Sequence, residues 1–250
     1  MHRKKLLVPF KTDRAYWTCP TCELGTLLVV KGSLKKDERQ SSRDHSHTQW
    51  EPGWIEYVYS CLFRCSNSTC KETVSSTGIG TVNESGYLND EESWVEVYRD
   101  VFTPKFFEPH LKLIRIPDSC PDAVRQALND SFRLFFAAPS SAATHLRIAV
   151  DHIVDDLEKS CSDTTATDRP KRKSKRLHER IESLPESTAK AMLMAVKWHG
   201  NAGAHEVDPM DHLNLLDAFD LMQSALEEIY SDNKRLVALA GEVNEKKGPL

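Results

Sequence analysis

The sequence lacks any long apolar run: none approaches the ~18 to 20 residues that a membrane-spanning helix needs. The stretch Met1–Pro9 is basic, but its apolar part is too short for a signal peptide. A repeat with a period of ~20 to 50 residues is also missing, and so is a recognisable cofactor-binding motif. These absences predict a protein without a membrane segment, and we expect it in the cytoplasm.

An excess of positive charge is lacking too, because the formal net charge is −4. Any binding of RNA or DNA must therefore be local. The basic run Arg169–Arg176 is the obvious candidate, since such runs attract phosphates through counterion release. The alternative is that it is a solvated loop beside a stretch rich in Ser, Thr and Asp.

What is present is typical of a soluble globular protein. The chain has 250 residues, of which 40% are hydrophobic and 28% charged, enough for one large or two small domains. We expect an α+β organisation with a small β domain at 1–100, an extended Pro-rich connector at 101–120 and a helical bundle at 121–235. Within the bundle, 160–176 is expected to be a weakly ordered basic linker, and 236–250 a tail.

In the first region, residues 23–30 predict a turn followed by a strand, and the polar residues 33–53 predict a long loop. Residues 54–65 alternate and predict a strand, and 73–82 predict a further one. One face of the 54–65 strand is expected to carry Tyr57, Tyr59, Cys61 and Phe63.

In the second region, apolar residues recur at helical spacing. The helices are expected after Pro121, from about 142 to 160, from 177 to 184, from 185–188 to 199, and after an Asp208–Pro209 cap.

Seven cysteines, an odd number, favour metal ligation over disulfides. Cys19 and Cys22 have the two-residue spacing of a zinc knuckle, and Cys65 and Cys70 have a wider one. Four thiolates form a closed tetrahedral shell, so we expect a structural Zn²⁺ that folds the domain and does not activate water. A Cys61/Cys65 pair is an alternative second knuckle, and buried free thiols are the alternative to any metal. Cys120 and Cys161 are expected to be incidental.

The segment Lys197–His205 lies between two helical patterns. Its Gly200–Asn201 step predicts a bend in the backbone, with His205 near the start of the next helix. A polar site fits this place better than a packed core does.

This segment resembles the C-terminal signature of a bacterial family called domain of unknown function 4145. The motifs Pro104–Pro109, Ile116–Pro121 and Leu146–Asp151 follow the same family's pattern, as does an N-terminal cysteine ribbon. The resemblance covers roughly residues 15 to 231. The family is similar to the HEPN group of helical-bundle domains, many of which are metal-independent ribonucleases, toxins or phage-defence effectors that act as dimers.

The resemblance implies an HEPN-like bundle, a homodimer and an endoribonuclease site. His205 would be the acid/base, Lys197 the cation, and Asn201 a donor or the group that orients His205. Arg147 would be a second phosphate contact, and Asp151 would fix the His205 tautomer. The HEPN signature has Arg followed after four to six residues by His, whereas Lys197 stands here and seven residues separate it from His205.

Structural alternatives stand beside each role. Asn201 can cap a helix, and His205 can be a satisfied buried histidine. Arg147 and Asp151 can form an ordinary helix-surface pair. The functional alternative is a non-catalytic module that binds nucleic acid or a protein partner.

Overall fold

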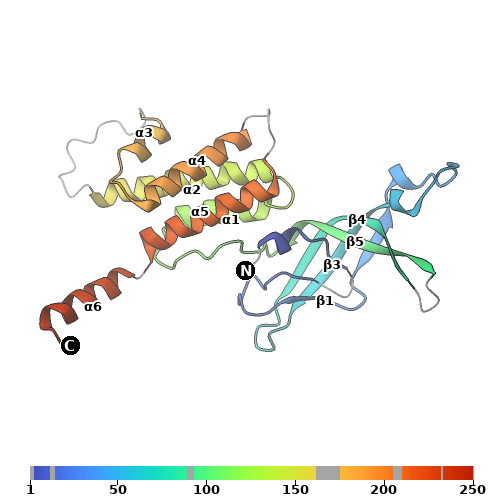
Figure 1. The fold of residues 1–250 in the computed structure, drawn as a ribbon, viewed down its shortest axis with the longest axis horizontal. Helices are drawn as coiled ribbons and strands as arrows, with labels where there is room; N and C mark the ends of the chain where they lie inside the picture. The colour runs from blue at the N-terminus through green and yellow to red at the C-terminus, as the bar shows by residue number, and fades with distance from the viewer. Residues whose placement is uncertain are drawn as a thin grey trace. The chain divides into compact units, whose positions relative to one another are not determined.

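A computed structural model describes residues 3–11, 15–88, 93–161, 175–204, 210–231 and 233–249. The chain divides into two compact units, Met1–Lys112 and Leu113–Leu250. The first contains a curled antiparallel sheet and the second contains helices, so the fold is mixed α and β (Figure 1). Among the described residues, no helix combines the length and the apolar character needed to cross a membrane.

Five strands form one sheet within the described residues. The order is β1-β3-β4-β5, with β2 also paired to β3, and all pairings are antiparallel. The strands are β1 (Leu27–Val29), β2 (Lys35–Glu38), β3 (Glu56–Cys65), β4 (Thr73–Leu88) and β5 (Trp94–Glu108). Short 3₁₀ helices are η1 (Arg3–Leu7), η2 (Gln40–Ser42) and η3 (Pro52–Trp54).

The predicted alternation of β3 is confirmed, because its odd-numbered residues from Tyr59 to Cys65 are buried and its even-numbered residues are exposed. The buried face packs against an aromatic core. Ring centroids in this core lie at contact distance, for example 5.2 Å between Phe10 and Phe63 and 4.9 Å between Trp17 and Phe107. Burial of such large rings stabilises the sheet unit.

The predicted connector at 101–120 is wrong for residues 101–108, which form the second half of β5. Pro104 suggested a connector, because proline cannot donate a hydrogen bond to a sheet. Here it lies opposite Gly78 at a register shift, where Lys105 has no partner in β4. A side chain at Gly78 would lie 2.2 Å from the Thr103 carbonyl oxygen, so glycine permits this close approach. Residues 109–120 contain neither helix nor strand.

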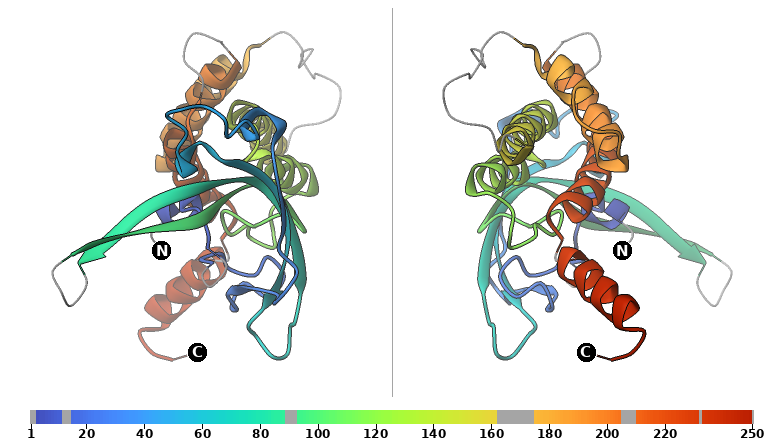
Figure 2. Two further views of the ribbon diagram at one scale, coloured as in Figure 1. Left: turned by 90° about the vertical axis from the view of Figure 1, so that its right-hand side faces the viewer. Right: turned by 90° about the vertical axis from the view of Figure 1, so that its left-hand side faces the viewer.

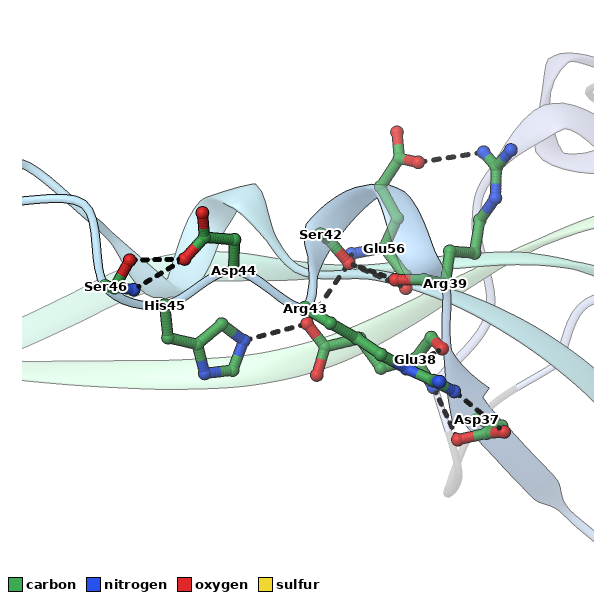
Figure 3. A network of polar contacts seen from close by, with 9 residues as sticks. All are labelled: Asp37, Glu38, Arg39, Ser42, Arg43, Asp44, His45, Ser46 and Glu56. Carbon is green, nitrogen blue, oxygen red and sulfur yellow. Dashed lines mark hydrogen bonds and ion pairs between the residues drawn. The ribbon is translucent and has the colours of Figure 1, made fainter.

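The predicted loop at 33–53 is also wrong in part, because it contains β2, η2 and the start of η3. A polar network holds it in place (Figure 3). Ser42 Oγ donates to Glu38 Oε1 at 3.1 Å and accepts from the Glu56 backbone N–H at 3.1 Å. Arg39 pairs with the Glu56 carboxylate at 2.8 Å, and His45 Nε2 lies 2.9 Å from Glu38 Oε1. Hydrogen bonds and ion pairs between polar side chains thus fix this segment, whereas burial of apolar side chains fixes β3.

Beyond Glu56 of β3, β4 and β5 continue as a two-stranded arm, in which the described residues pair only with each other (Figure 2). The predicted strand at 73–82 is therefore confirmed but continues to Leu88.

The second unit contains six helices among the described residues. They are α1 (Asp122–Leu134), α2 (Pro139–Cys161), α3 (Leu177–Glu182), α4 (Thr188–Ala204), α5 (His212–Tyr230) and α6 (Asn233–Lys246). Helix α2 packs against α1, α4 and α5, and α4 also packs against α5. Buried residues at helical spacing, such as Leu146, Ile153 and Phe219, form this core and confirm the predicted periodicity.

The predicted bend at Gly200–Asn201 is wrong, because α4 continues through both residues to Ala204. Glycine is needed for packing instead. A Cβ at Gly200 would lie 2.5 Å from Arg147 Cβ and 3.0 Å from the Ala143 carbonyl oxygen, both in α2.

Other boundaries also differ from expectation. The predicted tail at 236–250 is wrong as far as Lys246, because α6 occupies this stretch and Leu239 and Val243 keep helical spacing. Asp211 caps α5 by accepting from the Asn214 N–H at 2.7 Å. The Asp208–Pro209 cap and residues 162–174 of the predicted linker lie outside the described residues.

Candidate metal centre and candidate anion site

The first cysteine pair lies in a tight turn between the bridge residues Thr18 and Thr26. The Cys19 N–H donates to the Gly25 carbonyl at 2.8 Å, and the Glu23 N–H donates to the Cys19 carbonyl at 3.0 Å. Glu23 adopts a positive φ of 56° to close the turn. Local backbone geometry thus directs Cys19 and Cys22 to one side.

The second pair lies between β3 and β4. Cys65 ends β3, and the N–H groups of Cys70 and Lys71 both donate to the Asn67 carbonyl, at 3.1 and 3.0 Å. Lys71 has a positive φ of 52°. In both turns, the residue after the second cysteine has a positive φ. The second turn is longer, because four residues separate its cysteines instead of two.

The two turns bring four sulfur atoms together, each within 4.8 Å of the others. Cys19 Sγ lies 3.8 Å from Cys70 Sγ, and Cys22 Sγ lies 3.6 Å from Cys65 Sγ. A tetrahedral ion with bonds of about 2.3 Å to sulfur requires separations of about 3.8 Å. Disulfide bonding needs about 2.05 Å, so these distances fit shared coordination of a metal.

The surroundings of the sulfurs also fit a metal. A Cβ at Gly25 would lie 2.3 Å from Cys65 Sγ, so only glycine leaves room for the cluster. The backbone N–H groups of Gly25 and Leu24 lower the pKa of Cys22 to about 6, whereas burial raises the pKa of Cys65 to about 12. A cation that binds all four sulfurs would stabilise the thiolate form of each.

The remaining thiols stand apart from this cluster. Cys61 faces Ser33, with the sulfur 3.7 Å from the hydroxyl, so the alternative Cys61/Cys65 pair is not formed. Cys120 is buried, and burial raises the pKa of its thiol to about 11. The four cysteines that the structure brings together are therefore Cys19, Cys22, Cys65 and Cys70, as their spacing predicted.

In the helical unit, Lys197 of α4 is only 5% exposed. Its Nζ lies 3.2 Å from the ring centroid of Trp198, and no carboxylate or hydrogen-bond acceptor pairs with it in the described part of the chain. Burial and the neighbouring charge of Arg147 lower its pKa, while Glu182 acts in the opposite direction. Trp198 itself is 54% exposed.

Arg147 of α2 is the second cation. Its Nε is buried and has no hydrogen-bond partner. Its aliphatic carbons lie against Gly200, which is one turn after Lys197 on α4. Two like charges therefore meet between α2 and α4, one with an unsatisfied donor. Each buried polar group of this kind costs about 1 to 3 kcal/mol when it lacks a partner.

Asp151 lies one turn after Arg147 on α2, but its described partner is Arg180 of α3, whose Nη1 donates to Asp151 Oδ1 at 2.7 Å. Arg180 also donates to Asp155 at 2.5 Å and to Glu158 at 3.0 Å. These ion pairs raise the pKa of Arg180 and attach α3 to α2. Sequence reasoning missed Arg180, although the row of acids at Asp151, Asp155 and Glu158 is a readable signal.

Asn201 is partly exposed and lies four residues after Lys197 in the same helix, so both share one face of α4. His205 lies outside the described residues. Its predicted acid/base role, and the predicted effect of Asp151 on its tautomer, stay predictions.

Two protein-family models match parts of the chain. Residues 129–247 match the model described as Domain of unknown function (DUF4145). They form a DUF4145 domain. The predicted family is confirmed for this part of the chain, and the DUF4145 domain includes Arg147, Lys197 and all of α6. The match begins after the predicted motifs Pro104–Pro109 and Ile116–Pro121.

Residues 9–107 match a second model, Domain of unknown function (DUF8608), which contains all four clustered cysteines. Comparison with curated proteins and with solved structures gives no match.

Proposed function

We propose that the DUF4145 domain binds nucleic acid, and that Lys197 and Arg147 contact a backbone phosphate. The observation that carries the proposal is the pair of cations between α2 and α4, the buried Lys197 and the partly buried Arg147 with its buried Nε, neither of which has an ion-pair partner among the described residues. Stability alone disfavours such a pair, because two like charges repel and lose hydration.

A phosphate matches what the two side chains lack. The guanidinium of Arg147 offers planar donors, and the ammonium of Lys197 offers a point charge. Hydrogen bonds between charged groups are about twice as strong as neutral ones. Because the protein's net charge is −4, this local pair has to supply attraction that the whole surface does not.

RNA cleavage is a second candidate, favoured by the continuous helix α4. The helix places Asn201 one turn from Lys197, so a cation and an amide face the same side. His205 would then take the 2′-hydroxyl proton or protonate the leaving oxygen. This second candidate includes four further proposals: a homodimer, an HEPN-like bundle, a cytoplasmic location and a role as a toxin or phage-defence effector. It is supported by the family resemblance.

For the sheet unit, we propose that the four cysteines bind Zn²⁺. Four thiolates at tetrahedral spacing suit zinc or an iron–sulfur centre, and two tight turns that each supply two thiolates favour zinc. The shell would be closed, so the ion would stabilise the turns and leave no position for a substrate. Elemental analysis of the purified protein should find one zinc per chain, and its absence would contradict the assignment.

The test of nucleic-acid binding is fluorescence anisotropy with a labelled single-stranded RNA and no added divalent metal. Lys197→Met and Arg147→Met should each weaken binding about tenfold or more, since each removes a charged hydrogen bond. Lys159→Met is the matched control, because it removes the same charge from an exposed position of α2. Equal binding by all four proteins would contradict the proposal.

Cleavage is tested with the same RNA on a denaturing gel. Cutting by the wild type that disappears in His205→Ala supports the ribonuclease. Binding without cutting by either protein leaves a non-catalytic module and contradicts the enzyme. Light scattering of the same samples measures whether the chain is a dimer.

A further inference from the structure

In the β4–β5 arm, one face of the sheet extends past the end of the aromatic core. Opposite pairs alternate between the two faces, so Phe102, Asp100, Tyr98, Glu96 and Trp94 lie on one face of β5. At Phe102 this face is fully buried in the aromatic core. Farther along the arm it is exposed, with Trp94 63% and Tyr98 44% accessible to solvent.

The indole of Trp94 lies against Gly86 on β4. A Cβ at Gly86 would lie 2.1 Å from the indole ring, so glycine leaves the space that the ring occupies. The large apolar ring of β5 therefore lies over Gly86 of β4. Two-stranded hairpins are marginally stable in water on their own, so exposed aromatic rings here suggest a partner.

The charges around these rings have one sign. Tyr98 Oη donates to Glu96 Oε2 at 3.1 Å, and the carboxylates of Glu96, Glu84 and Glu51 together raise the pKa of Tyr98. At the base of the same face, Lys36 Nζ is already paired with Asp100 at 2.5 Å. The arm face, defined as Glu84, Gly86, Trp94, Glu96 and Tyr98, is therefore aromatic and acidic.

We propose that the arm face docks a cationic, Arg- or Lys-rich peptide segment of a partner protein. A guanidinium or ammonium over the Trp94 or Tyr98 ring gains a cation–π contact, and the surrounding carboxylates pair with the same charge. A nucleic acid would meet the carboxylates of Glu84 and Glu96 and be repelled. A second copy would bring the same negative face, which opposes self-association through it.

The experiment uses the full chain and a fluorescein-labelled peptide of alternating arginine and glycine, followed by anisotropy. Trp94→Ala should weaken binding about fivefold to tenfold while leaving the protein's charge unchanged. Gly86→Ala should weaken it too, because the new methyl group displaces the indole. Phe106→Ala is the matched control, because it removes an exposed aromatic from β5 outside the arm.

Charge is tested with Glu96→Gln, which should weaken binding and flatten its salt dependence, against Glu108→Gln as the matched control at an exposed position outside the arm. Trp94→Ala and Phe106→Ala binding the peptide equally would overturn the proposal, since only non-specific attraction would remain. Loss of a dimer or of RNA binding in Trp94→Ala would overturn it in favour of a second copy or a nucleic acid. Circular dichroism checks that each variant folds.

Discussion

The two units of this protein treat their buried polar groups in opposite ways. In the sheet unit, four cysteines from two separate turns converge until their sulfurs have the spacing of one coordination shell. In the DUF4145 domain, Lys197 and Arg147 lie close enough for their charges to interact, and no described acidic side chain forms an ion pair with either of them. The first cluster is closed once a metal binds, and the second stays incomplete within the described chain. Closed polar clusters serve folding, whereas incomplete ones point to a ligand.

The largest expected effect sharpens the sheet side of this comparison. Cys65→Ser should remove the metal and cost the sheet unit several kcal/mol of folding free energy, since metal binding and folding are coupled. Cys61→Ser, a buried cysteine outside the cluster, should keep the metal and lose far less. Elemental analysis and thermal unfolding by circular dichroism measure both. The prediction would be contradicted if Cys61→Ser lowered the stability of the sheet unit and Cys65→Ser did not.

A second prediction concerns a complete polar cluster within the helical unit. Arg180→Met should destabilise the helical unit by about 2 kcal/mol, because it leaves three carboxylates without their cation. The effect stays below that of a fully buried pair, since Asp151 is 47% exposed. Urea unfolding followed by circular dichroism gives the value. A neutral result would mean that α3 is held by its apolar residues alone.

The third prediction tests whether Gly200 is needed for the close packing of α2 against α4. Gly200→Ala should destabilise by about 1 to 2 kcal/mol, because the added Cβ meets Arg147 and Ala143. Gly241→Ala in α6 meets nothing within 4 Å and should stabilise by up to about 1 kcal/mol through helix propensity. Thermal unfolding of the pair measures both signs. Stabilisation by Gly200→Ala would contradict close packing of α2 and α4.

The smallest expected effect separates stability from function. Lys197→Met should stabilise the domain by about 1 kcal/mol, because it removes a charge from a side chain that is 5% exposed and has no described ion-pair partner. The pKa of Lys197 is lowered in the folded state, so between that value and 10.5 the unfolded chain binds more protons and wild-type stability rises with pH. The advantage of Lys197→Met should therefore shrink as pH rises through this window. Urea unfolding at a series of pH values measures it.

Sequence reasoning succeeded where the signal is local. The β3 faces follow from alternation over ten residues, and the metal cluster follows from cysteine spacing within two short turns. The arm of β4 and β5 was underestimated, because Pro104 hides a strand whose bulge only the partner strand reveals. The strand β2 was missed because its residues, Lys35–Glu38, carry no apolar alternation.

The helical site was harder because its geometry is tertiary. Glycine followed by asparagine predicts a helix end, and only the Arg147 side chain packed against Gly200 shows why glycine stands in the middle of α4. Arg147 and Lys197 were named from the family resemblance, but the burial of Lys197 and of the unpaired Arg147 Nε is a property of the packed helices. Arg180 was missed because the readable signal, the row of acids at Asp151, Asp155 and Glu158, lies in α2 and not in the six-residue helix that contains Arg180.

The most direct test of the central claim combines two readouts on Lys197→Met. The account predicts that this variant melts at or above the wild-type temperature and binds the labelled RNA about tenfold or more weakly. A variant that melts lower and binds RNA as the wild type does would show that Lys197 is a structural residue, and would contradict a phosphate site between α2 and α4.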